Sequence, residues 1–124
     1  MKQCDLKEKQ DVSTAEAKIL DEMVERLVKS LLDIFVLAKL QAKSELLGGY
    51  DVMELLYQDF GVLISSGTVY AVLYSMEREG LIKGEDTRSK RGYLLTEKGE
   101  KRFNDISEVK TGIVESLTKI FTQQ

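Results

Sequence analysis

Histidine is absent from this chain of 124 residues, and cysteine occurs once, at Cys4. Without histidine the chain lacks the commonest general base and metal ligand of enzymes. A single cysteine can form neither an internal disulfide nor a structural zinc site, so Cys4 is expected to be a reduced thiol without a role. No glycine-rich stretch has the lysine and spacing of a phosphate-binding loop. The sequence therefore predicts no enzymatic activity, no metal site and no cofactor.

Long apolar runs and linker-like segments are also missing. The N-terminal stretch MKQCDLKEKQDV is polar, and the longest apolar run is interrupted by Asp33 and Lys39, which speaks against a signal peptide and a membrane span. Proline does not occur and there are only nine glycines, so no segment resembles a flexible or proline-rich linker. We expect a soluble cytoplasmic protein with one ordered domain, appended elements and no membrane partner.

An excess of positive charge is lacking as well. Eighteen basic residues stand against twenty-one acidic ones, which gives a net charge of −3 and a pI near 5.1. The molecule as a whole therefore does not attract nucleic acid or an anionic membrane. Binding to a polyanion would have to come from locally clustered charge.

Helical patterns fill the first half of the chain. The stretch STAE at 13–16 is a capping box, in which a hydroxyl and a glutamate satisfy free backbone N–H groups, so a helix begins near Thr14. The following stretch LLDIFVLAKL at 31–40 is apolar on nearly every side, which is typical of a central core helix. A second start signal at Ser30 and Asp33 predicts a bend or restart of the helix there.

Two shorter helices and a hairpin follow. The first helix covers about 50–60, stops at Gly61 and should direct four side chains inward, namely Val52, Leu55, Leu56 and Phe60. The second begins after Ser65 or Ser66 and ends at Gly80. The stretches LIKGE and RGYLLT then predict two strands around the charged tip at 86–90. Thr96 starts a last helix, whose apolar residues recur every three or four positions: Phe103, Ile106, Val109, Ile113, Leu117 and Ile120.

This order predicts a mainly α fold with a small β-hairpin: a winged helix-turn-helix with additional N- and C-terminal helices. We expect three segments: an N-terminal tail and helix at 1–30, the winged helix-turn-helix domain at 31–96 and a C-terminal helix at 97–124. The same fold also serves as a protein-binding module.

The helix at about 66–79 has two different faces. At 100° per residue, Val69, Val72, Leu73 and Met76 share the face toward the core. The opposite face is small and polar, and small side chains at its centre would let the helix enter a major groove about 12 Å wide. A capped surface helix with half-buried tyrosines is the simpler alternative. The residues expected to meet DNA are Ser66, Gly67, Thr68, Tyr70, Ala71, Tyr74, Ser75 and Arg78.

The hairpin tip TRSKRG carries a cluster of cations, namely Arg88, Lys90 and Arg91. Such a tip can straddle a phosphate backbone or reach into a minor groove. The alternative is an edge hairpin that its charges keep soluble. Glu77 and Glu79 are expected to face the DNA near the end of the preceding helix and to moderate the affinity.

Three stretches resemble the PadR family of transcriptional regulators: GGYDVMELL, SSGTVYAVLYSMEREGLIKG and YLLTEKGEKRF. The resemblance extends over roughly 31–103 and implies a homodimeric winged-helix repressor with a dimerising C-terminal helix. It also implies that Thr68 and Tyr70 contact the DNA backbone, and that Gly49 and Tyr50 hold the N-terminus of the second helix. Some members bind aromatic ligands between subunits. Here no slot of stacked indoles can form, since the chain lacks tryptophan, and an effector remains open.

The apolar residues listed above for the last helix resemble a coiled-coil seam and are too apolar to face water. We expect them to pack on the N-terminal helix at 14–29, either in a second subunit or within the same chain. The sequence thus predicts a homodimeric regulator that binds double-stranded DNA sequence-specifically, with the third helix in the major groove. The alternative is a winged-helix protein-interaction module without DNA binding.

Overall fold

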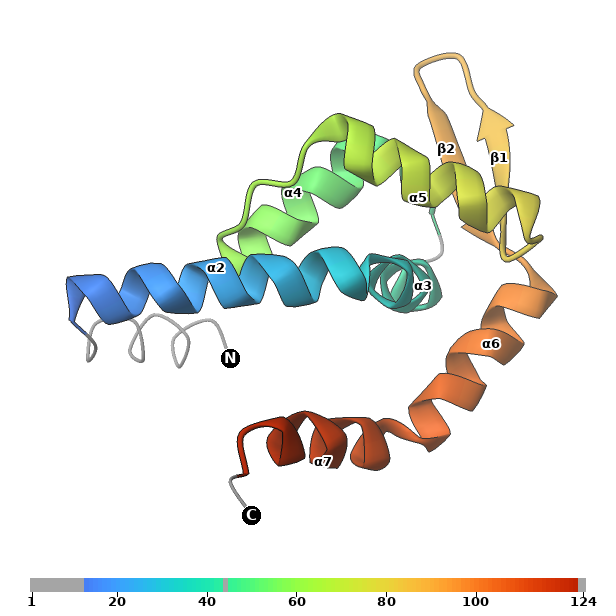
Figure 1. Ribbon diagram of the computed structural model, residues 1–124. Helices are drawn as coiled ribbons and strands as arrows, with labels where there is room; N and C mark the ends of the chain where they lie inside the picture. Colours follow the sequence, from blue (N-terminus) through green and yellow to red (C-terminus); the bar gives the residue numbers. More distant parts are fainter. Residues whose placement is uncertain (1–12, 44, 123–124) are drawn as a thin grey trace.

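The structure is a computed structural model that describes residues 13–43 and 45–122; Cys4 lies outside the described residues. These form six helices and one hairpin (Figure 1), which confirms the predicted winged helix-turn-helix with added terminal helices. Within these ranges, no helix is both long and apolar enough to cross a membrane. The elements are α2 (Thr14–Ser30), α3 (Leu32–Ala42), α4 (Gly49–Phe60), α5 (Ser66–Arg78), β1 (Ile82–Asp86), β2 (Arg91–Leu95), α6 (Glu97–Glu108) and α7 (Lys110–Ile120).

The first two helices are separate, as the restart signal predicted. The backbone N–H of Glu16 donates to Ser13 Oγ at 3.1 Å and begins α2. Helix α2 ends at Ser30, and α3 then runs in a different direction, so that Figure 1 shows it nearly end-on. Leu32, Val36, Leu37 and Leu40 of α3 are all buried, which confirms its place at the centre of the core.

The core lies between α3, α4 and α5 and reaches the base of the hairpin. The predicted inner face of α5 is confirmed, since Val69, Leu73 and Met76 are at most 1% exposed. On α4 the prediction was wrong for Phe60, which is 38% exposed. Its ring lies at the rim of the core, with its centroid 5.8 Å from that of Phe35, because α4 ends there and Gly61 turns the chain away with φ of 67°.

The wing is the antiparallel hairpin of β1 and β2, in which Ile82 lies opposite Leu95 and Asp86 opposite Arg91. The loop before α4 pairs with it through a single antiparallel bridge between Leu47 and Tyr93. Leu47 N–H donates to the Tyr93 carbonyl at 3.3 Å, and Tyr93 N–H donates to the Leu47 carbonyl at 2.9 Å. The base of the wing is thereby attached to the helical core.

The motif LTEKG joins the end of the wing to α6. The hydroxyl of Thr96 accepts a hydrogen bond from Gly99 N–H at 3.0 Å and so caps α6. The same hydroxyl lies 2.6 Å from the carbonyl oxygen of Gly80, to which it can donate. The backbone of Gly99 therefore lies against the segment that follows α5, and a Cβ atom there would overlap the carbonyl oxygen of Leu81.

Replacing Gly99 with alanine is expected to lower the free energy of unfolding by about 1–3 kcal/mol, the usual cost of overpacking. The obstacle is a backbone atom, which cannot rotate away as a side chain can. Urea denaturation measures the change. Gly67→Ala is the matched control, because its added Cβ meets nothing within 4 Å, and its midpoint should not fall. An unchanged midpoint for Gly99→Ala would contradict this packing.

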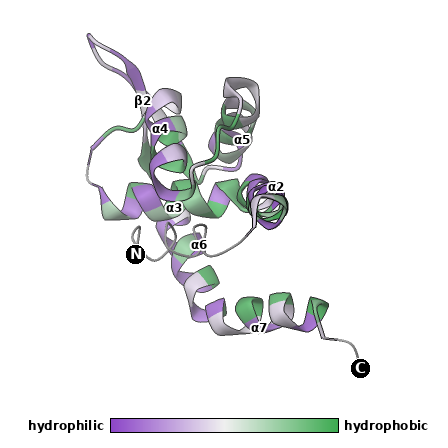
Figure 2. Ribbon diagram, turned by 90° about the vertical axis from the view of Figure 1, so that its left-hand side faces the viewer, coloured by the Kyte–Doolittle hydropathy of each residue, from purple (hydrophilic) through white to green (hydrophobic). Residues whose placement is uncertain are grey.

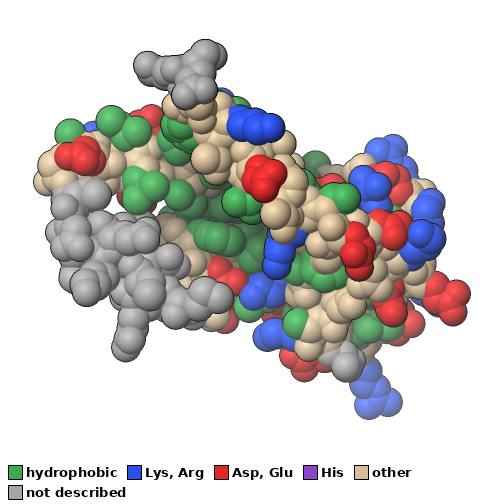
Figure 3. Space-filling model, turned by 90° about the horizontal axis from the view of Figure 1, so that it is seen from below, with side chains coloured by type: hydrophobic (Ala, Val, Ile, Leu, Met, Phe, Trp, Pro, Cys, Tyr) green, Lys and Arg blue, Asp and Glu red, His purple; other side chains and the backbone are tan. Residues whose placement is uncertain are grey.

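The prediction of one continuous C-terminal helix was wrong. The chain breaks at Val109, whose φ of −105° and ψ of 13° are not helical. Helix α6 stays with the core, where Phe103 packs against the buried cluster. Helix α7 contains no buried residue and lies on the side of the molecule opposite the wing (Figure 1). Hydrophobic residues recur along this helix (Figure 2). Seen from below, hydrophobic side chains gather in a hollow of that face (Figure 3).

Candidate nucleic-acid interface

The outer face of α5 is exposed, as predicted. Gly67, Ala71 and Arg78 are exposed, and Tyr74 is 68% exposed. Ser66 is also exposed, while Thr68 and Ser75 are half-buried on the flank. This face lies on the upper side of the molecule beside the wing, away from α7 (Figure 1). The contacts of these residues with DNA stay predictions.

The centre of this face is flat because it lacks large side chains. A Cβ atom at Gly67 would meet nothing within 4 Å, and Ala71 one turn later adds only a methyl group. At the start of the helix, Ser65 Oγ accepts from Thr68 N–H at 3.3 Å and lies 2.9 Å from Thr68 Oγ1. The Thr68 hydroxyl therefore belongs to the helix cap. The small residues at the centre of the face allow the helix to approach a groove closely.

Tyr70 braces α5 against the start of α4. A Cβ atom on Gly49 would lie 2.6 Å from Tyr70 Oη, so the tyrosine ring occupies the space that a side chain at this position would need. Tyr70 is still 41% exposed, whereas Tyr50 is 76% exposed. Gly49 thus shapes the N-terminus of α4, while the side chain of Tyr50 does not hold it.

The three cations of the wing tip have different surroundings. Lys90 Nζ donates to Asp51 Oδ2 of α4 at 2.5 Å. Arg91 donates from Nη2 to Glu77 of α5 at 3.3 Å, and from Nη1 to Asp86 of its own hairpin at 3.1 Å. Arg88 is exposed and forms no ion pair with any residue that the structure describes.

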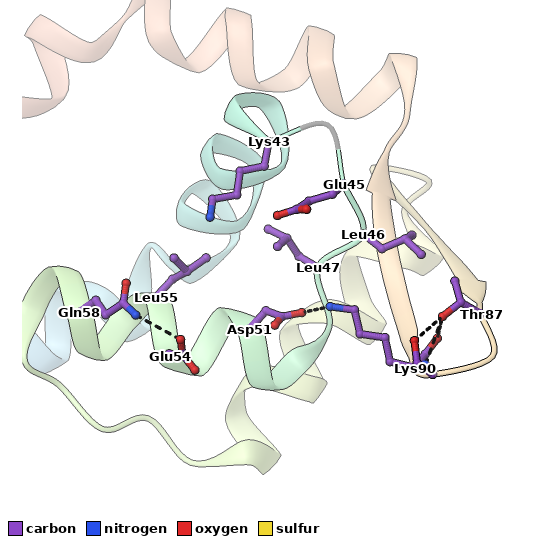
Figure 4. A pocket seen from close by; sticks show the side chains of 11 residues that line it. Lys43, Glu45, Leu46, Leu47, Asp51, Glu54, Leu55, Gln58, Thr87 and Lys90 are labelled. Atoms are coloured by element: carbon purple, nitrogen blue, oxygen red, sulfur yellow. Dashed lines mark hydrogen bonds and ion pairs between the residues drawn. The ribbon is translucent and has the colours of Figure 1, made fainter.

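Asp51 connects the wing tip to the N-terminus of α4 (Figure 4). Its Oδ2 accepts from Gly48 N–H at 2.7 Å as well as from Lys90. The hydrogen bond from Lys90, followed by that from Gly48 N–H, lowers the pKa of the Asp51 carboxyl below its ordinary value. Favourable contacts to the charged form keep this group ionised at neutral pH.

Glu77 points toward the wing and pairs with it, a contact that the sequence did not predict. Its Oε2 accepts from the backbone N–H of Gly84 in β1 at 3.2 Å and from Arg91. The side chain is only 31% exposed, because it lies between α5 and the hairpin. Glu79, two residues later, stays exposed as expected.

The ion pairs of Asp51 and Glu77 could not be predicted from the sequence. Asp51 lies 39 residues before Lys90, and Glu77 lies 14 residues before Arg91. In each pair the two residues lie in different elements, so no helical or strand period relates them. Only the folding of the hairpin onto α4 and α5 brings these pairs together.

A hollow of about 510 Å³ lies between the wing tip, α4 and the loop before it (Figure 4). Its walls include Lys43, Glu45 and Glu54 around Leu46 and Leu55. Both signs of charge are present in its walls. Throughout the described ranges, no group of three or more acidic or cysteine side chains is placed to hold a metal ion.

The model of the transcriptional regulator PadR-like family matches residues 36–105. A PadR family regulator from Eggerthella lenta DSM 2243 has a similar structure, with 23% identity, a TM-score of 0.64 and coverage of 90% of this chain and 100% of that one. A PadR-like regulator from Bacillus cereus strain ATCC 14579 is 19% identical, with a TM-score of 0.63 and coverage of 80% of this chain and 99% of that one. F93 from STIV, a winged-helix DNA-binding protein, is 25% identical, with a TM-score of 0.58 and coverage of 65% of this chain and 88% of that one. No curated protein matches the sequence.

Proposed function

Because the chain belongs to the PadR-like family of transcriptional regulators, we propose that it is a repressor that binds a specific double-stranded DNA site as a homodimer. The family consists of transcriptional regulators, so membership also confirms that the chain is not an enzyme. Repression and dimerisation follow the family resemblance of the sequence, and the exposed apolar surfaces of the terminal helices support dimerisation.

The observation that carries the DNA-binding proposal is the exposed, small-centred face of α5 beside a wing with an unpaired arginine. Gly67 and Ala71 allow the helix to approach the floor of the major groove. At the N-terminal end of the helix, Ser66, Thr68 and Tyr70 contact the phosphate backbone. One and two turns further on, Tyr74, Ser75 and Arg78 meet the edges of the bases. The wing contacts the adjacent backbone or minor groove through Arg88, with Lys90 and Arg91 beside it.

The homodimer accounts for two apolar surfaces that the single chain leaves exposed. On α2 and at its C-terminal end the exposed residues recur every four positions: Ile19, Met23, Leu27 and Leu31. At the start of α7 and along it the exposed residues include Val109, Ile113 and Ile120, and Leu117 is half-buried on the same side. Such patches mark interfaces more often than free surface. We assign dimerisation to residues 1–30 and 97–124, and DNA binding to residues 31–96. Of the six apolar residues expected at the dimer seam, Phe103 instead packs against the core of its own subunit, whereas Ile106 stays a proposed dimerisation residue.

Selection of bound fragments from random DNA tests the function directly. We expect a pseudo-palindromic site, because a two-fold dimer presents two copies of α5. Titration of the purified protein should then show binding to the selected duplex that is at least about a thousandfold tighter than to random duplex. Failure to enrich any duplex would favour the protein-interaction module, which the acidic pI also suits.

Arg88→Ala is expected to weaken binding to selected and random duplexes alike. Each phosphate contact that is lost should reduce the magnitude of the log–log salt slope by roughly 0.9, and a dimer loses two such contacts. Fluorescence anisotropy at several salt concentrations measures this slope. Arg102→Ala is the control, because Arg102 is exposed on α6, which runs away from the wing (Figure 1). Equal slopes for the two variants would remove Arg88 from the interface.

A further inference from the structure

Two acidic residues connect the wing tip to two different helices. Glu77 of α5 accepts from Arg91 at 3.3 Å, and Asp51 of α4 accepts from Lys90 at 2.5 Å. A two-stranded hairpin is marginally stable by itself, so its direction depends on contacts with the rest of the fold. We call these two ion pairs the wing latches.

The Glu77 latch contacts the backbone of the hairpin as well as one of its side chains. Glu77 Oε2 also accepts from Gly84 N–H at 3.2 Å, so the carboxylate binds both strands of the wing. A Cβ atom at Gly84 would lie 2.8 Å from Arg91 Cζ and 2.9 Å from Glu77 Oε2. The glycine thus leaves room for the ion pair. The Arg91 guanidinium also lies 5.7 Å from the centre of the Tyr93 ring.

The Asp51 latch acts closer to the tip. Within the tip, Thr87 N–H donates to the Lys90 carbonyl at 2.8 Å, and Lys90 N–H donates to Thr87 Oγ1 at 3.1 Å. These bonds close the turn and leave Arg88 and Ser89 at its apex. Because Lys90 is fixed to α4, the apex is fixed as well, and Arg88 projects from a turn of defined position.

We infer that Asp51 and Glu77 are positioning residues for DNA binding, which hold the wing in the orientation in which Arg88 meets the DNA. This inference rests on the proposed function. It reverses the usual expectation for acidic residues beside a DNA-binding surface, whose removal should strengthen binding to a polyanion. For Asp51 and Glu77, neutralisation weakens binding, because the wing then samples orientations in which Arg88 does not reach the duplex.

The size of the effect follows from the population of the competent orientation. Apparent affinity falls in proportion to the fraction of molecules whose wing is correctly placed. A partly exposed ion pair changes such an equilibrium by at most about fivefold. We therefore expect about fivefold weaker binding per subunit for the loss of one latch.

Glu77→Gln tests the Glu77 latch, with Glu79→Gln as its matched control. Both changes remove one negative charge from the end of α5, but Glu79 receives its side-chain hydrogen bond from Ser75 of the same helix at 3.4 Å and none from the wing. The second pair is Asp51→Asn with Glu54→Gln, one turn apart on α4. An asparagine at 51 can still accept from Gly48 N–H, so the helix cap persists while the charge for Lys90 is lost.

Affinity for the selected duplex is the first measurement, with thermal melting to confirm that each variant is folded. Glu77→Gln and Asp51→Asn should each bind about fivefold more weakly per subunit, whereas both controls should bind as tightly as the parent or more tightly. In an Arg88→Ala background the loss caused by Glu77→Gln should nearly disappear, because the latch acts through Arg88. If Glu77→Gln merely destabilised the fold, it would weaken DNA binding equally with and without Arg88.

Binding by Glu77→Gln as tight as that of Glu79→Gln would overturn the inference, as would an equal loss with and without Arg88. Hydrogen exchange separates this failure from a failure of the proposed function, because it needs no DNA. The Gly84 amide should exchange faster in Glu77→Ala than in Glu79→Ala, because alanine removes the acceptor of its hydrogen bond, and equal rates would refute the latch itself. A parent protein that binds no duplex but shows this difference would retain the latch and lose its role in DNA binding.

Discussion

Ala71→Phe is expected to abolish specific DNA binding, with an affinity for the selected duplex about a thousandfold lower than that of the parent. Ala71 lies on the exposed face of α5, about one turn after Gly67 and one turn before Tyr74. A benzyl group there would hold the helix away from the base edges. Only the sequence-independent attraction to phosphates would remain, and it is at least about a thousandfold weaker than specific binding.

The fold should tolerate this change, because Ala71 points away from the buried residues Val69 and Leu73. Ala42→Phe provides the matched control, since it adds the same group at an exposed alanine at the end of α3. Circular dichroism and melting should show both variants folded, and a binding titration should separate them. A folded Ala71→Phe variant that binds like the parent would exclude groove entry by this face and favour the interaction module.

The double variant Ile113→Lys, Leu117→Lys is expected to be a monomer at concentrations where the parent is a dimer. Both side chains line the apolar groove of α7, together with Val109 and Ile120. Each subunit would bring two ammonium groups into the proposed apolar interface. Burying an unpaired charge costs several kcal/mol, so the dissociation constant should rise by about three orders of magnitude or more.

Sedimentation equilibrium at micromolar concentration measures the association. Thr111→Lys, Thr118→Lys introduces the same charges on the opposite side of α7, where both threonines are exposed, and this control should remain a dimer. A parent that sediments as a monomer would contradict dimerisation, and a dimer that survives the double change would move the interface elsewhere. The monomeric variant should also lose the affinity that two linked half-sites provide.

The amino-acid sequence determined the elements of this protein and the direction of their faces. Ser13, Ser65 and Thr96 were identifiable as helix caps because a hydroxyl accepts from a nearby backbone N–H, and all three do so in the structure. The inner face of α5 followed from helical periodicity alone. These signals extend over a few residues, so they can be read without knowledge of the fold. The roles of the exposed residues on DNA remain predictions.

The tertiary structure decided what depends on residues far apart in the chain. The apolar spacing runs without interruption from Phe103 to Ile120, yet the chain breaks at Val109, because α6 is held by the core while α7 is not. The sequence placed Glu77 toward the DNA and grouped the three wing cations together. Only the packing of the wing on α4 and α5 turned Glu77 and Asp51 toward Arg91 and Lys90 and left Arg88 without an ion pair among the residues that the structure describes. Charges pair through space, and their separation along the chain does not encode such pairs.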